Sequence, residues 1–304
     1  MVFPGQGSQR VGMQADLAAV YPVVQQTYEE ASEALGYDLW ALVQGGPVER
    51  LAETTVTQPA MLAAGTAAFR VWLAAGGDLP VQLAGHSLGE YSALVAAGSF
   101  SFADAMKIVL RRSELMQGAV PAGIGAMAAI IGLDDESVIA ACDEASSIGV
   151  AEPVNFNSPG QVVVAGHKEA VEGVIARCKA AGARMAMILP VSVPTHSSLM
   201  IGAGEALGEA LAAAEISAPQ VKVVAATDGV AYTDANDIRL RLSQQVYAPV
   251  HWVTTVKALI AGGATRFIEC GPGKVLAGLS RRIDKATPVT FVDSIESLQK
   301  ALDA

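Results

Sequence analysis

The sequence is poor in cysteine, with only Cys142, Cys178 and Cys270 among 304 residues. Their wide spacing matches no metal-ligand pattern, and an odd number of thiols cannot all pair. We therefore expect three buried, reduced thiols in a cytoplasmic protein, and neither a disulfide framework nor a metal site.

Positive charge is also scarce. Lysine and arginine number 20 against 30 acidic residues, a formal net charge of −10. Because phosphate backbones require a basic face, this balance argues against nucleic acid as the main partner. It leaves room for a local basic patch.

Long apolar runs are missing as well. No segment approaches the roughly 20 apolar residues of a membrane span. The opening MVFPGQGSQ has no basic stretch and no apolar stretch of signal-peptide length. We expect a soluble, cytoplasmic protein without membrane contact. Apolar residues make up 52% of the chain, enough for the core of one large domain, or of a large and a small one.

The first part of the chain alternates strands and helices. Val2-Phe3 reads as the end of a strand whose first residues are missing, and 81–84 as a second strand. This order predicts a mostly parallel sheet covered by helices. The expected helices span 15–35, 59–75, 88–97 and 102–117.

The order changes near Gly123 to β-α-β-β-α-β, the ferredoxin-like pattern. We predict a small domain at 123–193, inserted into a large α/β domain made of 1–122 and 194–304. Its expected strands are 127–131, 150–155, 162–165 and 184–189, and its helices 134–145 and 168–181. The large domain then continues with helices at 198–214, 237–245, 250–261 and 274–283, and strands at 221–225, 266–269 and 288–292.

The most informative motif is Gly-His-Ser-Leu-Gly at 85–89. It follows a buried-type strand and opens a helix, which is the setting of a nucleophile elbow. Such a turn presents Ser87 at the carboxyl end of a strand, next to the free N–H groups of a helix start. The other interpretation is a glycine-rich turn with Ser87 as an ordinary N-cap.

A nucleophilic serine needs a base, and the chain has only four histidines. His86 is adjacent to Ser87 and should point elsewhere, and His167 opens a helix of the small domain. His251 begins a helix in the large domain. His196 lies where the chain returns from the small domain, a typical cleft position. Position alone favours His196 over His251.

Arg112 falls on the apolar stripe of helix 102–117, three and four residues after Val109 and Ile108. A buried guanidinium is costly unless it meets an anion. Arginine suits a carboxylate because it offers parallel hydrogen bonds. Arg112 therefore either binds a substrate carboxylate or forms an internal salt bridge.

Two glycine-rich turns remain. Gly5-Gln6-Gly7 could bring backbone N–H groups close to a ligand, although a tight turn explains it equally. Gly271-Pro272-Gly273 precedes a helix and is similar to an anion-binding helix start. It lacks the Lys-Ser/Thr ending of a P-loop, which argues against nucleotide hydrolysis.

Taken together, these segments resemble the malonyl-CoA:acyl carrier protein transacylase family. The similar segments follow the family's order along nearly the whole chain: FPGQGSQ at 3–9, GHSLGEYSAL at 85–94, NFNSPGQ at 155–161, VSVPTH at 191–196, QVYAPV at 245–250 and GPGKVL at 271–276. The resemblance implies an α/β-hydrolase-like large domain with a mostly parallel sheet, carrying an inserted ferredoxin-like (βαββαβ) small domain.

The resemblance also implies a role for each matching residue. Ser87 would attack the thioester, and His196 would act as base and then acid. Gln6 and Leu88 would offer backbone N–H groups to the oxyanion. Arg112 would hold the malonyl carboxylate. The main-chain carbonyl of Gln245 would orient His196, which makes a Ser-His dyad in place of an acidic triad.

The implied reaction moves malonyl from malonyl-CoA to the phosphopantetheine thiol of acyl carrier protein, in ping-pong order, for fatty acid biosynthesis. No cofactor is implied. A serine hydrolase or thioesterase of related fold is the alternative, and Arg112 and the inserted unit favour the transferase. A non-catalytic module that binds carrier protein is a third class, and the presence of both Ser87 and His196 argues against it.

Carrier protein is acidic in this family, so docking on an acidic chain needs local positive charge. Basic residues gather on and after helix 274–283. We expect four of them to form part of the docking face: Lys274, Arg281, Arg282 and Lys285. The other interpretation is a solvated basic helix end that complements the helix dipole.

Overall fold

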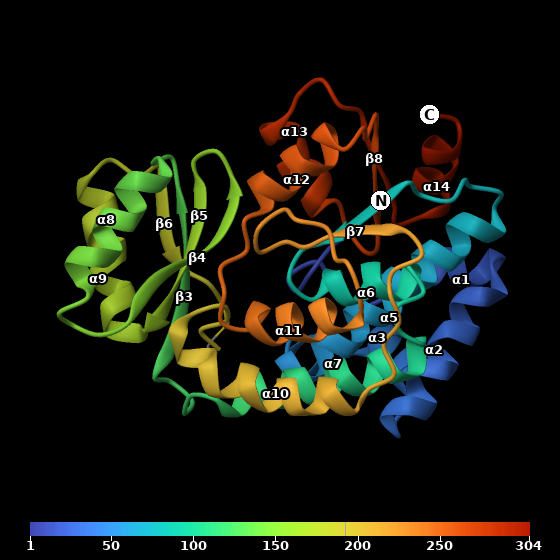
Figure 1. The fold of residues 1–304 in the computed structure, drawn as a ribbon, viewed down its shortest axis with the longest axis horizontal. Coiled ribbons are helices and arrows are strands. Elements are labelled where there is room, and N and C mark those ends of the chain that lie inside the picture. The colour runs from blue at the N-terminus through green and yellow to red at the C-terminus, as the bar shows by residue number, and fades with distance from the viewer. Residues whose placement is uncertain (192) are drawn as a thin grey trace.

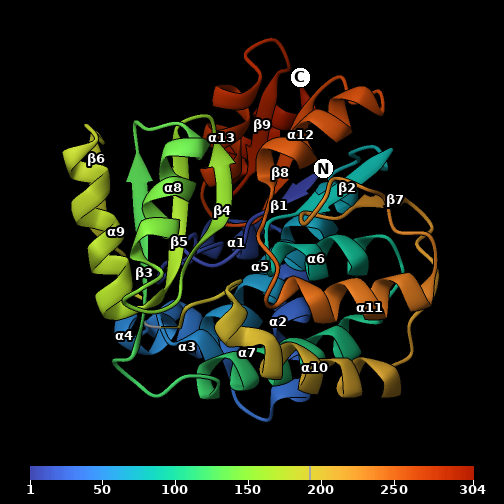
Figure 2. The same cartoon turned by 60° about the vertical axis from the view of Figure 1, so that its left-hand side comes forward.

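The strands of the protein form two separate sheets (Figure 1). The structure, a computed structural model, describes residues 1–191 and 193–304; Ser192, part of the VSVPTH segment, lies outside the described residues. Sheet A has the order β7-β2-β1-β8-β9, and every neighbouring pair in it is parallel (Figure 2). Its strands are β1 (Val2–Phe3), β2 (Gln82–Gly85), β7 (Lys222–Val224), β8 (Phe267–Cys270) and β9 (Val289–Val292).

Sheet B is antiparallel, with the order β4-β5-β3-β6. Together with its two helices it has the chain order β-α-β-β-α-β. The predicted fold class, a mostly parallel sheet plus a ferredoxin-like unit, is therefore confirmed. The elements of this unit are β3 (Gly125–Ile131), α8 (Asp135–Ala145), β4 (Ala151–Ser158), β5 (Gln161–His167), α9 (Lys168–Ala180) and β6 (Met185–Ile188).

Alternation along its strands gives sheet A two buried faces, as expected for a parallel sheet. Val2 packs among residues of α12 and α13, whereas its neighbour Phe3 packs among residues of α5 and α6. The sheet is thus covered by helices on both sides. These helices are α5 (Thr54–Ala74), α6 (Gly89–Ala96), α12 (Trp252–Ala261) and α13 (Val275–Ile283).

The remaining helices surround this centre on the side of α5 and α6. The larger core cluster joins residues of α2, α5, α7 and α10 into one apolar body. The remaining helices of the large body are α1 (Ala15–Val20), α2 (Pro22–Leu35), α3 (Leu39–Gly45), α4 (Val48–Leu51), α7 (Phe102–Gly118), the 3₁₀ turn η1 (Ser198–Met200), α10 (Ile201–Ala213), α11 (Ala235–Gln245) and α14 (Ile295–Leu302).

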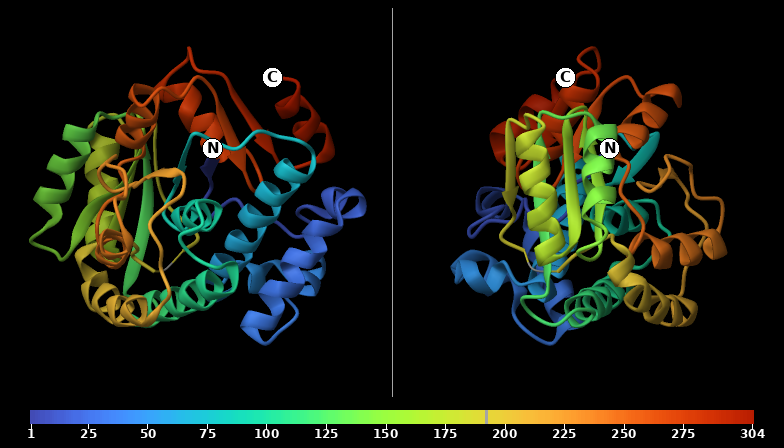
Figure 3. Two further views of the ribbon diagram at one scale, coloured as in Figure 1. Left: turned by 45° about the vertical axis from the view of Figure 1, so that its right-hand side comes forward. Right: turned by 90° about the vertical axis from the view of Figure 1, so that its left-hand side faces the viewer.

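Sheet B presents different faces to its surroundings. Ala128 and Ile130 are buried against residues of α8 and α9, which cover the side of the sheet away from the large body (Figures 1 and 3). Met127 and Val163 point to the opposite face, where they line the space between the two sheets. One face of sheet B is therefore core, and the other is a wall of the cleft.

Strand β4 ties sheet B to the large body. The Phe156 N–H donates to the carbonyl of Val250 at 2.8 Å, and the Val250 N–H donates to Val154. The Phe156 ring stacks on His251 with 4.7 Å between ring centroids. The cleft is thus closed along one edge by backbone and ring contacts.

Some helix boundaries differ from the predictions. The expected helix 15–35 is two helices, because the chain is extended at Tyr21, ahead of Pro22. Helix α5 begins at Thr54, so Pro59 lies inside it and does not start it. The expected helix 198–214 opens with a 3₁₀ turn. Three short helices, α3, α4 and α14, were not predicted.

Cys142, Cys178 and Cys270 are buried and unpaired, which confirms their expected state. Across residues 1–191 and 193–304, no helix combines the length and apolar character needed to cross a membrane.

Candidate active site

The turn between β2 and α6 holds Ser87 in a left-handed backbone conformation, with φ of 52°. That conformation costs a non-glycine residue about 1–2 kcal/mol, so the surroundings must enforce it. A Cβ on Gly85 would lie 1.9 Å from the carbonyl carbon of Gly89, and one on Gly89 would lie 2.1 Å from the oxygen of Phe3. Only glycine allows strands and helix to approach this closely, and the result is the predicted strand-to-helix elbow.

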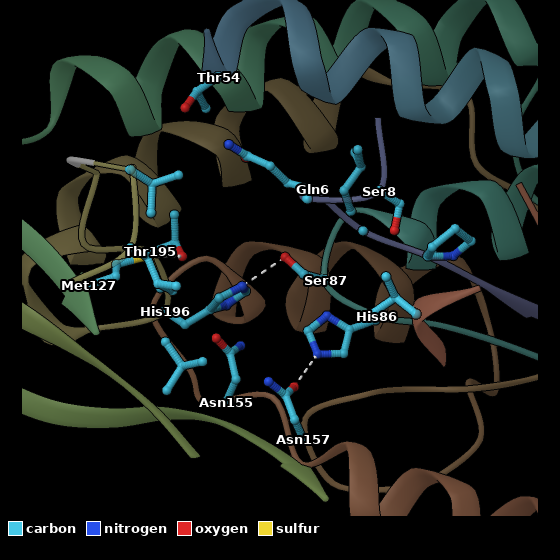
Figure 4. A pocket seen from close by; sticks show the side chains of 18 of the residues that line it. Gln6, Ser8, Thr54, His86, Ser87, Met127, Asn155, Asn157, Thr195 and His196 are labelled. Carbon is cyan, nitrogen blue, oxygen red and sulfur yellow. Dashed lines mark hydrogen bonds between the residues drawn. The ribbon is translucent and has the colours of Figure 1, made fainter. Parts of the chain in front are cut away.

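His196 is the histidine that meets Ser87. Its Nε2 lies 2.7 Å from Ser87 Oγ (Figure 4). Its Nδ1 lies 2.7 Å from the main-chain oxygen of Gln245. The carbonyl can only accept, so Nδ1 carries the proton and Nε2 is free to accept the serine proton. A second bond, from the His196 N–H to Val246 O at 3.0 Å, holds the residue at φ of 67°.

Burial lowers the pKa of His196 to about 3, and the nearby positive charge of Arg112 acts in the same direction. The bond to the carbonyl of Gln245 opposes this shift only in part. The imidazole is therefore neutral at physiological pH, which is the form that can take a proton.

The other histidines have different partners. His86 Nε2 lies 2.8 Å from Asn157 Oδ1 on β4, and its ring packs near Trp252 (Figure 4). His167 accepts a backbone hydrogen bond from Val150, and His251 stacks on Phe156. The positional preference for His196 over His251 agrees with the geometry.

Arg112 is 1% exposed, so its predicted place on the buried stripe of α7 is confirmed. Its Nη1 donates to Gln58 Oε1 at 2.6 Å, and its Nη2 donates to Gln245 Oε1 at 3.0 Å and to Ser87 Oγ at 3.3 Å. The guanidinium also lies over the ring of Tyr91, 5.6 Å from its centroid. In the part of the chain that the structure describes, Arg112 forms no ion pair with a carboxylate, and its Nε has no partner.

Three side-chain contributions were not foreseen. Gln58 holds Arg112, and the side chain of Gln245 joins Arg112 to the buried Glu90. Gln58 was missed because the helix was expected to begin only at Pro59. The sequence did carry a signal for Glu90, because a carboxylate among the apolar residues of a helix indicates a buried polar contact.

Gln6 and Leu88 line the same pocket as Ser87, and each carries a backbone N–H group. Within the described residues, neither donates a hydrogen bond to the protein. The two loops meet closely here, since a Cβ on Gly5 would lie 2.6 Å from the carbonyl oxygen of His86. Two free donors beside a nucleophile can stabilise a developing negative oxygen.

A pocket of about 600 Å³ surrounds these groups. Sheet B contributes Met127 and Val163 to its wall, and α13 contributes Leu276 and Leu279. Ser87 lies in this pocket, which sheet B, α13 and the loops after β1 and β2 line. A bound substrate would therefore contact sheet B and these loops.

The Gly271-Pro272-Gly273 turn does not supply a free anion site at the start of α13. The chain's own Glu269 carboxylate accepts the N–H groups of Leu276 and Ala277, at 3.1 and 2.7 Å. Burial raises the pKa of Glu269 to about 7, and these two bonds oppose the shift. The start of α13 therefore does bind an anion, but the anion is the protein's own Glu269 carboxylate.

The four expected docking residues are all exposed at α13 and just beyond it. Two of them have protein partners: Arg281 donates to Val289 O, and Arg282 donates to Gln161 Oε1 at 2.7 Å, across to sheet B. Lys274 precedes the helix, and Lys285 follows it.

The chain is similar to known acyltransferases. The family described as "Acyl transferase domain" matches residues 1–303. The malonyl CoA-acyl carrier protein transacylase of Escherichia coli K12 is 54% identical over 302 residues, which cover 99% of this chain and 98% of that protein.

Solved structures agree as well. A crystal structure of an acyl carrier protein S-malonyltransferase from Vibrio cholerae has a TM-score of 0.96 and 56% identity, covering 99% of this chain and 98% of that one. A malonyl-transacylase in complex with its type II PKS acyl-carrier protein has a TM-score of 0.98 and 52% identity, covering 100% and 98%.

The lowered pKa of His196 predicts how Ser87 reactivity depends on pH. We expect the rate of Ser87 modification by a fluorophosphonate to stay constant within about twofold from about pH 5 to about pH 8, because the imidazole remains neutral. An ordinary histidine would give a fall centred near pH 6.5. Intact mass against time measures this rate, and circular dichroism at each pH checks the fold. A fall centred near 6.5 in folded protein contradicts the assignment.

The same shift affects stability. Unfolding returns the pKa of His196 from about 3 to its ordinary value near 6.5. Between these values the unfolded chain binds the proton and the folded chain does not. The contribution of His196 to the free energy of unfolding is therefore complete above about pH 6.5. The free energy of unfolding decreases as pH falls from there toward about 3.

Proposed function

The chain belongs to the acyl transferase family, and from that premise we propose that it moves a malonyl group from malonyl-CoA to acyl carrier protein through a malonyl ester on Ser87. The observation that carries this proposal is the meeting of three groups at one point. Ser87 Oγ lies 2.7 Å from a neutral histidine and 3.3 Å from a buried arginine that has no carboxylate partner in the described residues. A nucleophile, a base and an anion binder are thus adjacent.

In the first half-reaction, Ser87 Oγ attacks the thioester carbonyl while its proton passes to His196 Nε2. The tetrahedral intermediate collapses, the carbon–sulfur bond breaks, and the coenzyme A sulfur takes that proton from His196. The carbonyl of Gln245 accepts from Nδ1–H throughout and keeps Nε2 aimed at the serine. We assign Ser87 and His196 as a catalytic dyad.

The negative oxygen of that intermediate needs donors. We assign them to the N–H groups of Leu88 and Gln6. Leu88 is the N-cap residue of α6, where the helix dipole adds a positive potential. Loss of one such donor typically costs a factor of about 100–1,000 in rate.

Arg112 is assigned to the substrate carboxylate. Its contacts Gln58, Gln245 and Ser87 are all uncharged, so an entering carboxylate would be its first direct ionic partner. A fixed acyl chain also keeps the ester aligned for the incoming thiol. An acyl group without a carboxylate would leave the guanidinium unpaired, which favours malonyl over acetyl.

In the second half-reaction, the phosphopantetheine thiol of carrier protein attacks the malonyl ester. His196 takes the thiol proton and returns it to Ser87 Oγ as the ester bond breaks. The two half-reactions use one site, and this gives ping-pong kinetics. The malonyl group on carrier protein then supplies chain elongation in fatty acid biosynthesis. The reaction balances with its two substrates and needs no cofactor. Both substrates are intracellular, so we assign the protein to the cytoplasm.

We divide the chain into a large catalytic domain, 1–122 with 194–304, and a small domain, 123–193. The separate core clusters of the two sheets support this division. Ser87 comes from the first unit, and His196 lies just after the return from the second, so both boundaries bear on the site.

For docking we assign the basic residues at α13. The helix borders the pocket through Leu276 and Leu279, so charge on its exposed side lies beside the route to Ser87. Arg281 and Arg282 also hold Val289 and Gln161, which makes Lys274 and Lys285 the cleaner probes.

The malonyl ester is directly testable. Incubation with malonyl-CoA and no acceptor should give a stable malonyl adduct, located on Ser87 by intact mass and peptide mapping. Ser87→Ala should give none. Rapid release of free malonate would support a hydrolase, and neither adduct nor turnover would leave a non-catalytic binding module.

Arg112→Ala tests the carboxylate assignment. We expect kcat/KM for malonyl-CoA to fall by about 100-fold or more, because the carboxylate loses a charge-assisted partner. Acylation by acetyl-CoA should be retained or improved. Single-turnover mass measurements with both thioesters give the comparison. An unchanged preference would remove Arg112 from the site.

The docking assignment predicts a selective effect of charge. In the double variant Lys274→Glu, Lys285→Glu, we expect the KM for carrier protein to rise about tenfold, while acylation by malonyl-CoA changes by less than about twofold. Lys179→Glu, an equally exposed site on α9, is the matched control and should leave both unchanged. Equal effects on both substrates would refute the assignment.

A further inference from the structure

Glu90 is a fully buried carboxylate in the first turn of α6, three residues after Ser87. Its helix neighbours Tyr91, Ala93 and Leu94 are buried in the core. A buried carboxylate is costly unless donors satisfy it. Acyl transfer by Ser87 and His196 does not use Glu90, so the buried position of this carboxylate needs another explanation.

Donors surround this carboxylate. The Tyr232 hydroxyl donates to Oε1 at 2.5 Å, and Gln245 Nε2 donates to Oε2 at 2.5 Å. Tyr232 is itself held, because Arg241 lies over its ring at 4.7 Å from the centroid. Each carboxylate oxygen of Glu90 therefore has a donor. One of the two donors is Gln245, whose main-chain carbonyl is hydrogen-bonded to His196.

The contacts of Gln245 leave its amide only one suitable orientation. The Nε2 group also donates to Ser87 O at 3.0 Å, while Oε1 accepts from Arg112. Arginine can only donate and a carboxylate accepts, so a flipped amide would face Arg112 with N–H groups and Glu90 with oxygen. Both new contacts would be repulsive. Glu90 thereby helps to keep the Gln245 oxygen on the guanidinium.

Charge gives Glu90 a second effect. In the described residues Arg112 has no direct carboxylate partner, and Glu90 is linked to it through a single amide. Burial lowers the pKa of Arg112, while Tyr91 and then Glu90 raise it. Burial also raises the pKa of Glu90, and its hydrogen bonds from Tyr232 and Gln245 oppose that shift. In its charged form, held by these two donors, Glu90 favours the charged form of Arg112. A carboxylate in direct contact would have to be displaced by the substrate. One amide away, it stabilises the guanidinium without occupying the edge that binds.

We propose that Glu90 is a positioning residue for recognition of the substrate carboxylate: through Gln245 it supplies the counter-charge of Arg112 and orients the amide that holds the guanidinium. This inference rests on the proposed function and extends it to a residue that touches neither substrate nor reacting atoms. It predicts an effect on acyl preference beyond any general loss of stability.

The test is Glu90→Gln, which keeps the shape and removes the charge. Single-turnover acylation of Ser87 is measured with malonyl-CoA and with acetyl-CoA, alongside Tm. We expect kcat/KM for malonyl-CoA to fall about tenfold or more and that for acetyl-CoA to change less than about threefold, so the malonyl/acetyl ratio falls. A parallel loss with both thioesters indicates a merely structural role and overturns the proposal.

A charge-relocation variant sharpens the result. Glu90→Gln combined with Gln245→Glu keeps the net charge and moves the carboxylate into direct contact with Arg112. We expect malonyl acylation to remain depressed by about tenfold or more, since the substrate must now displace that carboxylate. Recovery to the wild-type rate would overturn the requirement for an intervening amide.

Tyrosine variants provide a milder pair. Tyr232→Phe removes one donor to Glu90 and should lower the malonyl/acetyl ratio about two- to fivefold. Tyr28→Phe removes a buried hydroxyl that donates to Gln14 among the N-terminal helices, and should lower Tm without changing the ratio. If Glu90→Gln does not fold, Tyr232→Phe decides the question, and an unchanged ratio in that folded variant overturns the proposal.

The wild-type protein separates this inference from the proposed function. Absence of a malonyl adduct in the wild type removes both. A normal wild-type adduct with an unchanged ratio in Glu90→Gln removes only the role of Glu90.

Discussion

The site depends on the close backbone contact of β1, β2 and α6 at two glycines. Gly85 and Gly89 let the helix start lie against Phe3, and this packing holds Ser87 in a conformation that an isolated chain would avoid. The core around α5 and α6 provides the stability that offsets the strain. Without this contact the hydroxyl would not project between the sheets, and the free N–H groups beside it would not converge.

Gln245 holds His196 and Arg112, two site residues that lie outside the turn around Ser87. Its main chain holds His196, and its side chain holds Arg112, so the proposed base and the proposed anion binder share one support at the end of α11. Within residues 1–191 and 193–304, the two ring nitrogens of His196 are hydrogen-bonded to Ser87 Oγ and to the Gln245 carbonyl, and neither is bonded to a carboxylate. The nearest equivalent, Glu90, acts on the amide side of Gln245 and leaves the imidazole uncharged.

Much of this could be predicted because the signals are local. Glycine spacing around Ser87 and the position of Arg112 on an apolar stripe are readable within one element, and the order of strands and helices indicated both sheets. The choice of His196 over His251 depended on topology. Gln58, Glu90 and the side chain of Gln245 escaped because each acts on a residue far away in sequence: 54 positions separate Gln58 from Arg112, and 155 separate Glu90 from Gln245. Helices α3, α4 and α14 were not predicted because each is too short to show a clear apolar periodicity.

The tie between β4 and the large body has a mechanical consequence. Asn157 on β4 contacts His86, the residue before Ser87, and the adjacent Phe156 donates its N–H to the carbonyl of Val250. A rotation of sheet B against sheet A would therefore pull directly on the elbow. These contacts therefore oppose a hinge motion between the two sheets. The pocket can then adapt to a bound molecule mainly through the side chains that line it.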